Sequence, residues 1–113
     1  MTMYLLSFPA RAMVVDKAEL PAVSEASHAV VRAAKAAGVW VFGGGIDDRI
    51  APVLVDGTGE VRPGGYPETA ELDGGFAILE LPSEAAAHAW AAKLAVACRC
   101  PQQVRVFGDD PEH

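Results

Sequence analysis

The segments VWVF at residues 39–42 and FAIL at residues 76–79 decide the fold, because each is apolar at every position. β-Branched and aromatic residues favour strands, and an antiparallel strand with one wet face alternates apolar and polar residues. Neither segment alternates in this way. We therefore predict that both segments are strands of a sheet whose two faces are shielded from water.

Two segments with helical periodicity accompany these strands. Apolar residues recur at steps of three and four between residues 21 and 37, opposite a polar stripe of the same period. A second helix is predicted over residues 83–98, with Ser83 as its N-cap. The apolar stripe of this second helix is expected to consist of Trp90, Leu94, and Ala97 or Cys98.

Shorter apolar runs at residues 3–8, 49–55 and 104–107 predict the remaining strands. The turn DGTG at residues 56–59 predicts a hairpin with a short second arm. The order of elements predicts an α+β fold, a ferredoxin-like sandwich with an antiparallel sheet and two helices on one face. Because two helices cover only one face, we expect a homodimer through the helix-free sheet face.

Length and composition restrict the class of protein. The chain has 113 residues, 51% of them apolar, and nine Lys and Arg against fifteen Asp and Glu give a formal net charge of −6. We predict one domain over residues 1–108 and an acidic tail at residues 109–113. The negative charge argues against nucleic acid as a partner. No apolar run reaches the ~20 residues that span a bilayer, and no signal peptide is recognisable, so we expect a cytoplasmic protein without a membrane partner.

Cysteines and histidines do not form a recognisable metal or nucleophile site. Cys98 and Cys100 are too close in sequence for an unstrained disulfide and are expected as reduced thiols. They supply two metal ligands, whereas a structural zinc site needs four and a catalytic site three. His28 and His88 are expected on exposed helix faces, and His113 belongs to the tail. We therefore expect no metal and no cofactor.

The glycine run at residues 43–45 is interpreted as a bulge or bend near the sheet edge. A phosphate-binding loop would be followed by a helix N-terminus or by Lys-Ser/Thr, and this run is followed by neither. Trp40 and Trp90 are expected in the core, one from the sheet and one from the second helix.

Most of the polar candidates for a site lie between residues 62 and 73, beside the two apolar strands. The candidates are Arg62, Tyr66, Glu68 and Thr69. Polar side chains at the mouth of an apolar cavity are the usual construction of a small-ligand site. In the alternative, this segment is a surface loop whose polar side chains only bond to their own backbone.

Three stretches carry a family resemblance, namely AAGVWVFGGGI at residues 36–46, GGYPETAELDGGF at residues 64–76 and the helix ending in CRCP at residues 98–101. Together they resemble the YCII-related superfamily, and more narrowly its DGPF-like branch. The resemblance extends over roughly residues 3–107. It implies a ferredoxin-like fold that dimerises sheet to sheet into an α/β barrel.

The resemblance also assigns site residues. Tyr66 takes the family's aromatic position, and Glu68 and Thr69 match its Glu-Thr, while Arg62 is added on charge alone. Pro63 stands where the DGPF signature has its aspartate. YCII proteins proper carry a helix-one His and an Asp-Pro after helix two, proposed as a catalytic pair. The corresponding positions here are Ser27 and Cys100-Pro101, so a His/Asp mechanism is not expected.

Two functions remain open at this point. The first is a non-catalytic dimer that binds a small ligand or has a regulatory role, with Tyr66, Thr69 and Arg62 as ligand-binding residues. The resemblance encourages the regulatory reading, because DGPF proteins are often encoded beside extracytoplasmic-function sigma factors. The second is a small-molecule enzyme of lyase type with Glu68 as general base. The missing His/Asp pair favours the first function.

Overall fold

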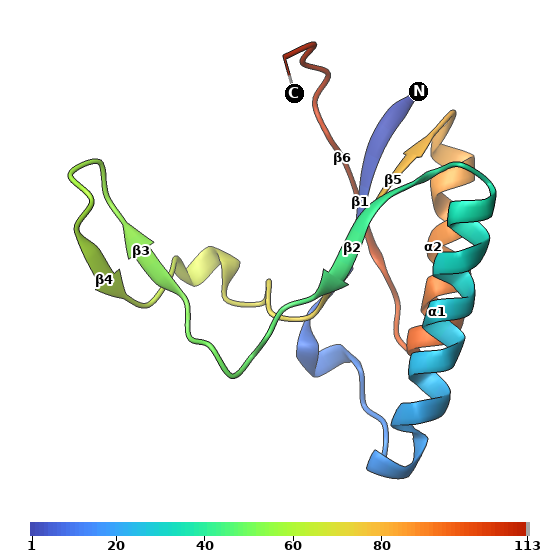
Figure 1. The fold of residues 1–113 in the computed structure, drawn as a ribbon, viewed down its shortest axis with the longest axis horizontal. Coiled ribbons are helices and arrows are strands. Elements are labelled where there is room, and N and C mark those ends of the chain that lie inside the picture. Colours follow the sequence, from blue (N-terminus) through green and yellow to red (C-terminus); the bar gives the residue numbers. More distant parts are fainter. Residues whose placement is uncertain (113) are drawn as a thin grey trace.

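The main sheet has four antiparallel strands in the order β2-β5-β1-β6, and both long helices lie on one of its faces (Figure 1). The computed structural model describes residues 1–112, and His113 lies outside the described residues. This arrangement is a mixed α+β fold compatible with the predicted ferredoxin-like sandwich. The elements are β1 (Thr2–Phe8), α1 (Leu20–Ala36), β2 (Trp40–Gly45), β5 (Gly75–Leu81), α2 (Glu84–Cys98) and β6 (Gln103–Val106).

The core lies between the helices and one face of the sheet. Side chains alternate between the faces of a strand, so every second residue of β1 and β5 points towards the helices. Leu6, Leu79 and Leu81 are at most 1% exposed there, and each such burial contributes about 1.5–3 kcal/mol. The helices contribute small or aliphatic side chains to this core, namely Ala34, Ala87, Ala91 and Leu94.

The predicted boundaries of the helices are close to the observed ones. Gly38, directly after α1, adopts a positive φ of 75°, which glycine does without a steric penalty. Ser83 is the N-cap of α2, because its Oγ accepts a hydrogen bond from the backbone N–H of Ala86 at 3.1 Å. The predicted stripe of α2 is confirmed for Leu94, Ala97 and Cys98, which are buried, whereas Trp90 is only partly buried. Ala87 and Ala91 complete the buried side of the helix.

The bulge in β2 lies before the glycine run rather than within it. The register between β2 and β5 shifts between Trp40 and Phe42, which places Val41 in the bulge. Gly43 has a different role, because a Cβ at that position would lie 2.3 Å from the indole ring of Trp40. The missing side chain therefore leaves room for this indole, which packs partly buried against the core, as Trp90 does.

The segment between β2 and β5 leaves the body of the molecule. Strands β3 (Val53–Val55) and β4 (Val61–Pro63) form the predicted hairpin, a separate two-stranded sheet. The hairpin projects away from the helices (Figure 1). The strand predicted to begin at Arg49 is wrong in its first half, because Asp47 accepts hydrogen bonds from the Arg49 backbone and guanidinium and forms a turn there.

Short 3-10 helices complete the chain at Ala10–Ala12 (η1), Lys17–Glu19 (η2) and Pro67–Thr69 (η3). Within residues 1–112, no helix combines the length and the apolar character that crossing a membrane requires.

Candidate functional site

The face of the sheet opposite the helices carries apolar side chains that the chain itself leaves open. Cross-strand pairing places Phe42, Ile78 and Leu5 in one row across β2, β5 and β1. Phe42 is 64% exposed, and Phe107, which follows β6, is 44% exposed. Apolar side chains of the two predicted strands therefore lie on both faces, but the predicted shielding of the second face from water is not seen within residues 1–112, because the helices cover only one face.

A cavity of about 150 Å³ opens on this helix-free face, at the end of the sheet next to η3. Its floor is a row of cross-strand neighbours in which Ser7 on β1 pairs with Phe76 on β5 and with Gln103 on β6. Arg105, two residues further along β6, extends the same face. The wall that faces these strands comes from the segment at and after η3, namely Glu68, Glu71 and Leu72.

Ser7 is a polar residue on the floor of this cavity, and only 7% of its surface is exposed. Buried hydroxyl groups nearly always have a hydrogen-bond partner. The Ser7 hydroxyl forms no hydrogen bond with any residue in the range 1–112. Every side-chain polar atom in that range that is completely shut off from solvent does have a partner, so the Ser7 oxygen is not completely shut off. Its oxygen is therefore reachable from the cavity and is available to a molecule bound there.

An ion pair outside the strands positions the wall of the cavity. Arg11 binds Glu71 through two hydrogen bonds, at 2.5 Å and 3.1 Å, and this guanidinium holds the pKa of Glu71 below its usual value. Asp73 accepts a hydrogen bond from the backbone N–H of Ala10 at 3.0 Å. Both bonds join the η3 segment to the chain that follows β1. Because the ion pair is exposed, it positions this wall more than it stabilises the fold.

Two further charged residues of the cavity have no such partner. Glu68 and Arg105 both line it, and neither forms an ion pair with any residue in the described range 1–112. The Arg105 guanidinium can donate a forked pair of hydrogen bonds to a carboxylate or phosphate. The cavity thus presents one unpaired cation and one unpaired anion.

Of the predicted site residues, Glu68 lines this cavity and the other three lie elsewhere. Tyr66 is 65% exposed, and its backbone carbonyl accepts a hydrogen bond from the Thr69 hydroxyl at 3.2 Å. Thr69 therefore stabilises its own turn, as the loop interpretation expected. Arg62 is exposed on β4, opposite Leu54 in the hairpin.

Sequence reasoning missed Ser7, Gln103 and Arg105. A signal for them exists, because polar residues at alternate positions interrupt otherwise apolar strands. In β6 the sequence QVRV places Gln103 and Arg105 on one face, and the pairing of this strand with β1 adds Ser7 to the same face. Without knowledge of that pairing, the three residues have no visible relation to Glu68.

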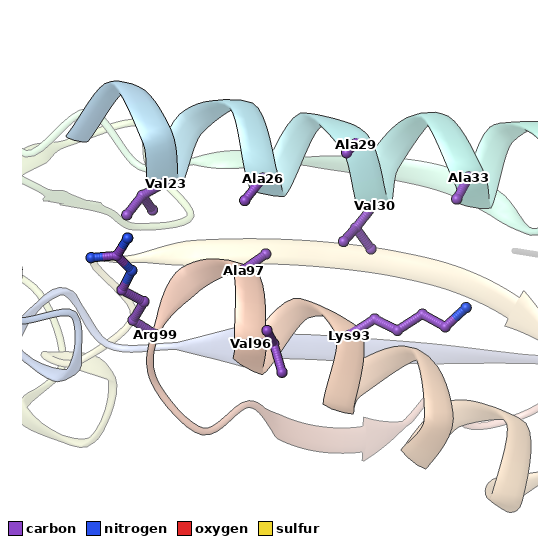
Figure 2. Close-up of a pocket in the computed structure, with 9 residues that line it drawn as sticks. All are labelled: Val23, Ala26, Ala29, Val30, Ala33, Lys93, Val96, Ala97 and Arg99. Carbon is purple, nitrogen blue, oxygen red and sulfur yellow. The ribbon is translucent and has the colours of Figure 1, made fainter. Parts of the chain in front are cut away.

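A larger groove of about 590 Å³ lies between α1 and α2 (Figure 2). Its walls are mainly alanine and valine side chains from the two helices, including Val23, Val30 and Val96. Both cations at its edges are already engaged, since the Lys93 ammonium lies 4.7 Å from the centre of the Trp90 ring and Arg99 pairs with Glu19 at 2.8 Å. This groove offers no unpaired polar group comparable with those of the smaller cavity.

His28, His88, Cys98 and Cys100 lie outside the cavity. His28 is exposed on α1, as expected, and His88 lies 3.5 Å from Glu84 on the exposed face of α2. Cys98 and Cys100 are buried free thiols, and burial raises the pKa of both. Across residues 1–112, three or more metal-ligating side chains do not come together at any point.

The helices, most of the sheet and the cavity residues from Ser7 to Phe76 lie within one stretch that can be compared with known proteins, whereas Gln103 and Arg105 follow it. No curated protein matches the chain. The family description that does match is the YCII-related domain, over residues 2–99. This match includes every helix and every strand except β6. The chain therefore belongs to the YCII-related domain family.

Proposed function

We propose that this protein is a non-catalytic, DGPF-like homodimer of the cytoplasm that binds a small ligand on the helix-free face of its sheet. The observation that carries this proposal is the cavity on that face, with the Ser7 hydroxyl on its floor and Glu68 and Arg105 unpaired at its sides. Small-ligand sites combine an apolar surface with a few convergent polar groups. The exposed side chains of Phe42 and Phe107 supply further apolar surface on the same face.

The homodimer follows from the same face. Large exposed apolar patches on soluble proteins mark interaction sites, and a two-fold dimer pairs the same patch of both copies. The β3-β4 hairpin supports this arrangement, because Val53, Val55 and Val61 are each at least 55% exposed. An isolated two-stranded hairpin is marginal in water. A second copy on the helix-free face would give the hairpin a surface to pack against.

The alternative function is a lyase in which Glu68 acts as general base. Its support is the position of Glu68 on the cavity wall, facing the same space as Arg105. The positions of the family's catalytic pair argue against it. Ser27 donates its hydroxyl hydrogen bond to the backbone carbonyl of Ser24, and Cys100 is a buried thiol. With neither a His nor an Asp at these positions, ligand binding is the function that the site supports better.

Native mass spectrometry of the full chain, purified without added ligand, tests this proposal. We expect a dimer that carries a small-molecule adduct, and we expect Arg105→Gln to lose the adduct. Arg62→Gln is the matched control, because Arg62 lies on the hairpin outside the cavity. A monomer at micromolar concentration in sedimentation velocity, with no adduct, would overturn both parts of the proposal. Chemical conversion of the released ligand by the protein would establish the lyase instead.

A further inference from the structure

The charges around the cavity restrict what can bind in it. Five charged side chains lie there or next to it. Arg11 and Glu71 form a bidentate pair, and Asp73 accepts a hydrogen bond from the backbone N–H of Ala10. Glu68 and Arg105 remain, with opposite signs and without ion pairs to residues 1–112. A simple anion would be attracted by Arg105 and repelled by Glu68. A simple cation would be attracted by Glu68 and repelled by Arg105.

The hydrogen-bonding groups of the cavity are separated like its charges, with donors on one side and an acceptor on the other. Arg105 lies on the sheet side with Gln103 and Ser7, so a guanidinium, an amide and a hydroxyl can all donate there. Glu68 lies on the opposite wall and, when ionised, can only accept. One side therefore suits a carboxylate, and the other suits a protonated amine.

We infer that the ligand is a small zwitterion with a carboxylate and a protonated amine, such as an α-amino acid. This inference rests on the proposed function, because it names the ligand class of the same cavity. The carboxylate would accept hydrogen bonds from Arg105, Gln103 and Ser7, and the ammonium group would donate to Glu68. The cavity of about 150 Å³ holds about five waters at ~30 Å³ each, which is the size of a small amino acid.

The test compares L-alanine with two fragments of it. Propionate is L-alanine without its amine, and ethylamine is L-alanine without its carboxylate. Each is titrated into the ¹⁵N-labelled full chain, and the backbone amide shifts of Ser7, Gln103 and Arg105 are followed. We expect a Kd for L-alanine at least tenfold below those of propionate and ethylamine.

Two variants assign the groups. We expect Glu68→Gln to raise the Kd of L-alanine to that of propionate and to leave propionate unweakened, because the variant removes both the partner of the amine and a charge that repels a carboxylate. We expect Arg105→Gln to weaken L-alanine and propionate by at least tenfold and to leave ethylamine unweakened. Arg62→Gln is the control for Arg105→Gln, because it changes the net charge by the same amount and Arg62 lies outside the cavity.

The failures of this inference and of the proposed function are distinguishable. Equal affinity for the three compounds, or no effect of Glu68→Gln, would overturn the zwitterion while leaving a ligand site in place. If none of the three compounds shifts the cavity amides, the zwitterion is also overturned. The proposed function fails by a separate result, namely a monomer at micromolar concentration that carries no adduct by native mass spectrometry.

Discussion

The two faces of the main sheet are made of the same strands but end in different environments. On the helix-covered face Leu79 is 1% exposed, whereas Ile78, its neighbour in the chain, points to the other face and pairs with Phe42, which is 64% exposed. The covered face is completed by α1 and α2. The open face has equally apolar residues and, at one end, the polar floor of the cavity. An apolar strand residue is thus not evidence of burial within its own chain.

The largest expected effect separates the two faces on one strand. We expect Leu79→Ala to lower the free energy of unfolding by about 2–5 kcal/mol, because it leaves a cavity in the packed core. Ile78→Ala is the matched control, and its loss at monomer concentrations should be less than half as large. Urea denaturation followed by circular dichroism measures both. Equal losses would show that the open face is packed within the single chain.

A pair of neighbouring glycines gives the next largest effect. A Cβ at Gly43 would lie 2.3 Å from the Trp40 ring on the covered face, whereas a Cβ at Gly44 would have no heavy atom within 4 Å. We expect Gly43→Ala to destabilise the protein by about 1–3 kcal/mol and to shift the Trp40 fluorescence. Gly44→Ala should be neutral or slightly stabilising. The comparison fails if both substitutions are tolerated equally.

The open face itself is tested by Phe42→Asp. We expect this change to weaken dimerisation by at least about tenfold, or ~1.4 kcal/mol, because a charge would then be buried against the second copy. Analytical ultracentrifugation over a concentration series measures the dimer Kd. Val96→Asp introduces the same charge on α2, where Val96 is 81% exposed, and should leave the Kd unchanged. If Val96→Asp disrupts the dimer and Phe42→Asp does not, the helical face is the interface.

The smallest effect concerns the ion pair at the border of the open face. Arg11 lowers the pKa of Glu71. The stabilisation that this ion pair contributes is therefore lost as the pH falls through the lowered pKa of Glu71 and is present above the ordinary Glu pKa of 4.5. The Arg11 ¹⁵Nε chemical shift should therefore titrate with a midpoint below that value. Glu71→Gln should remove the transition. Since both side chains are exposed, global stability should change little. A transition that persists in Glu71→Gln would assign the titration to another carboxylate.

Much of the fold could be predicted because its signals are local. The apolar period of three and four residues, Ser83 as N-cap, Gly38 after α1 and the turn at residues 56–59 each act within a few residues of the chain. The strand predicted from Arg49 failed for a reason that is also local. The Asp47 side chain competes for the backbone N–H of Arg49, and this competition outweighs the apolar run that follows.

The sequence by itself determined two helices, the strands and the apolar character of both sheet faces, because side-chain alternation and capping depend only on neighbouring residues. Only the tertiary structure decided the site. Glu68 was visible as a polar residue beside an apolar strand, but Ser7 and Arg105, which line the same cavity, come from the two ends of the chain. They meet because β1 lies between β5 and β6, a pairing fixed by packing the whole sheet against α1 and α2 and by no local pattern.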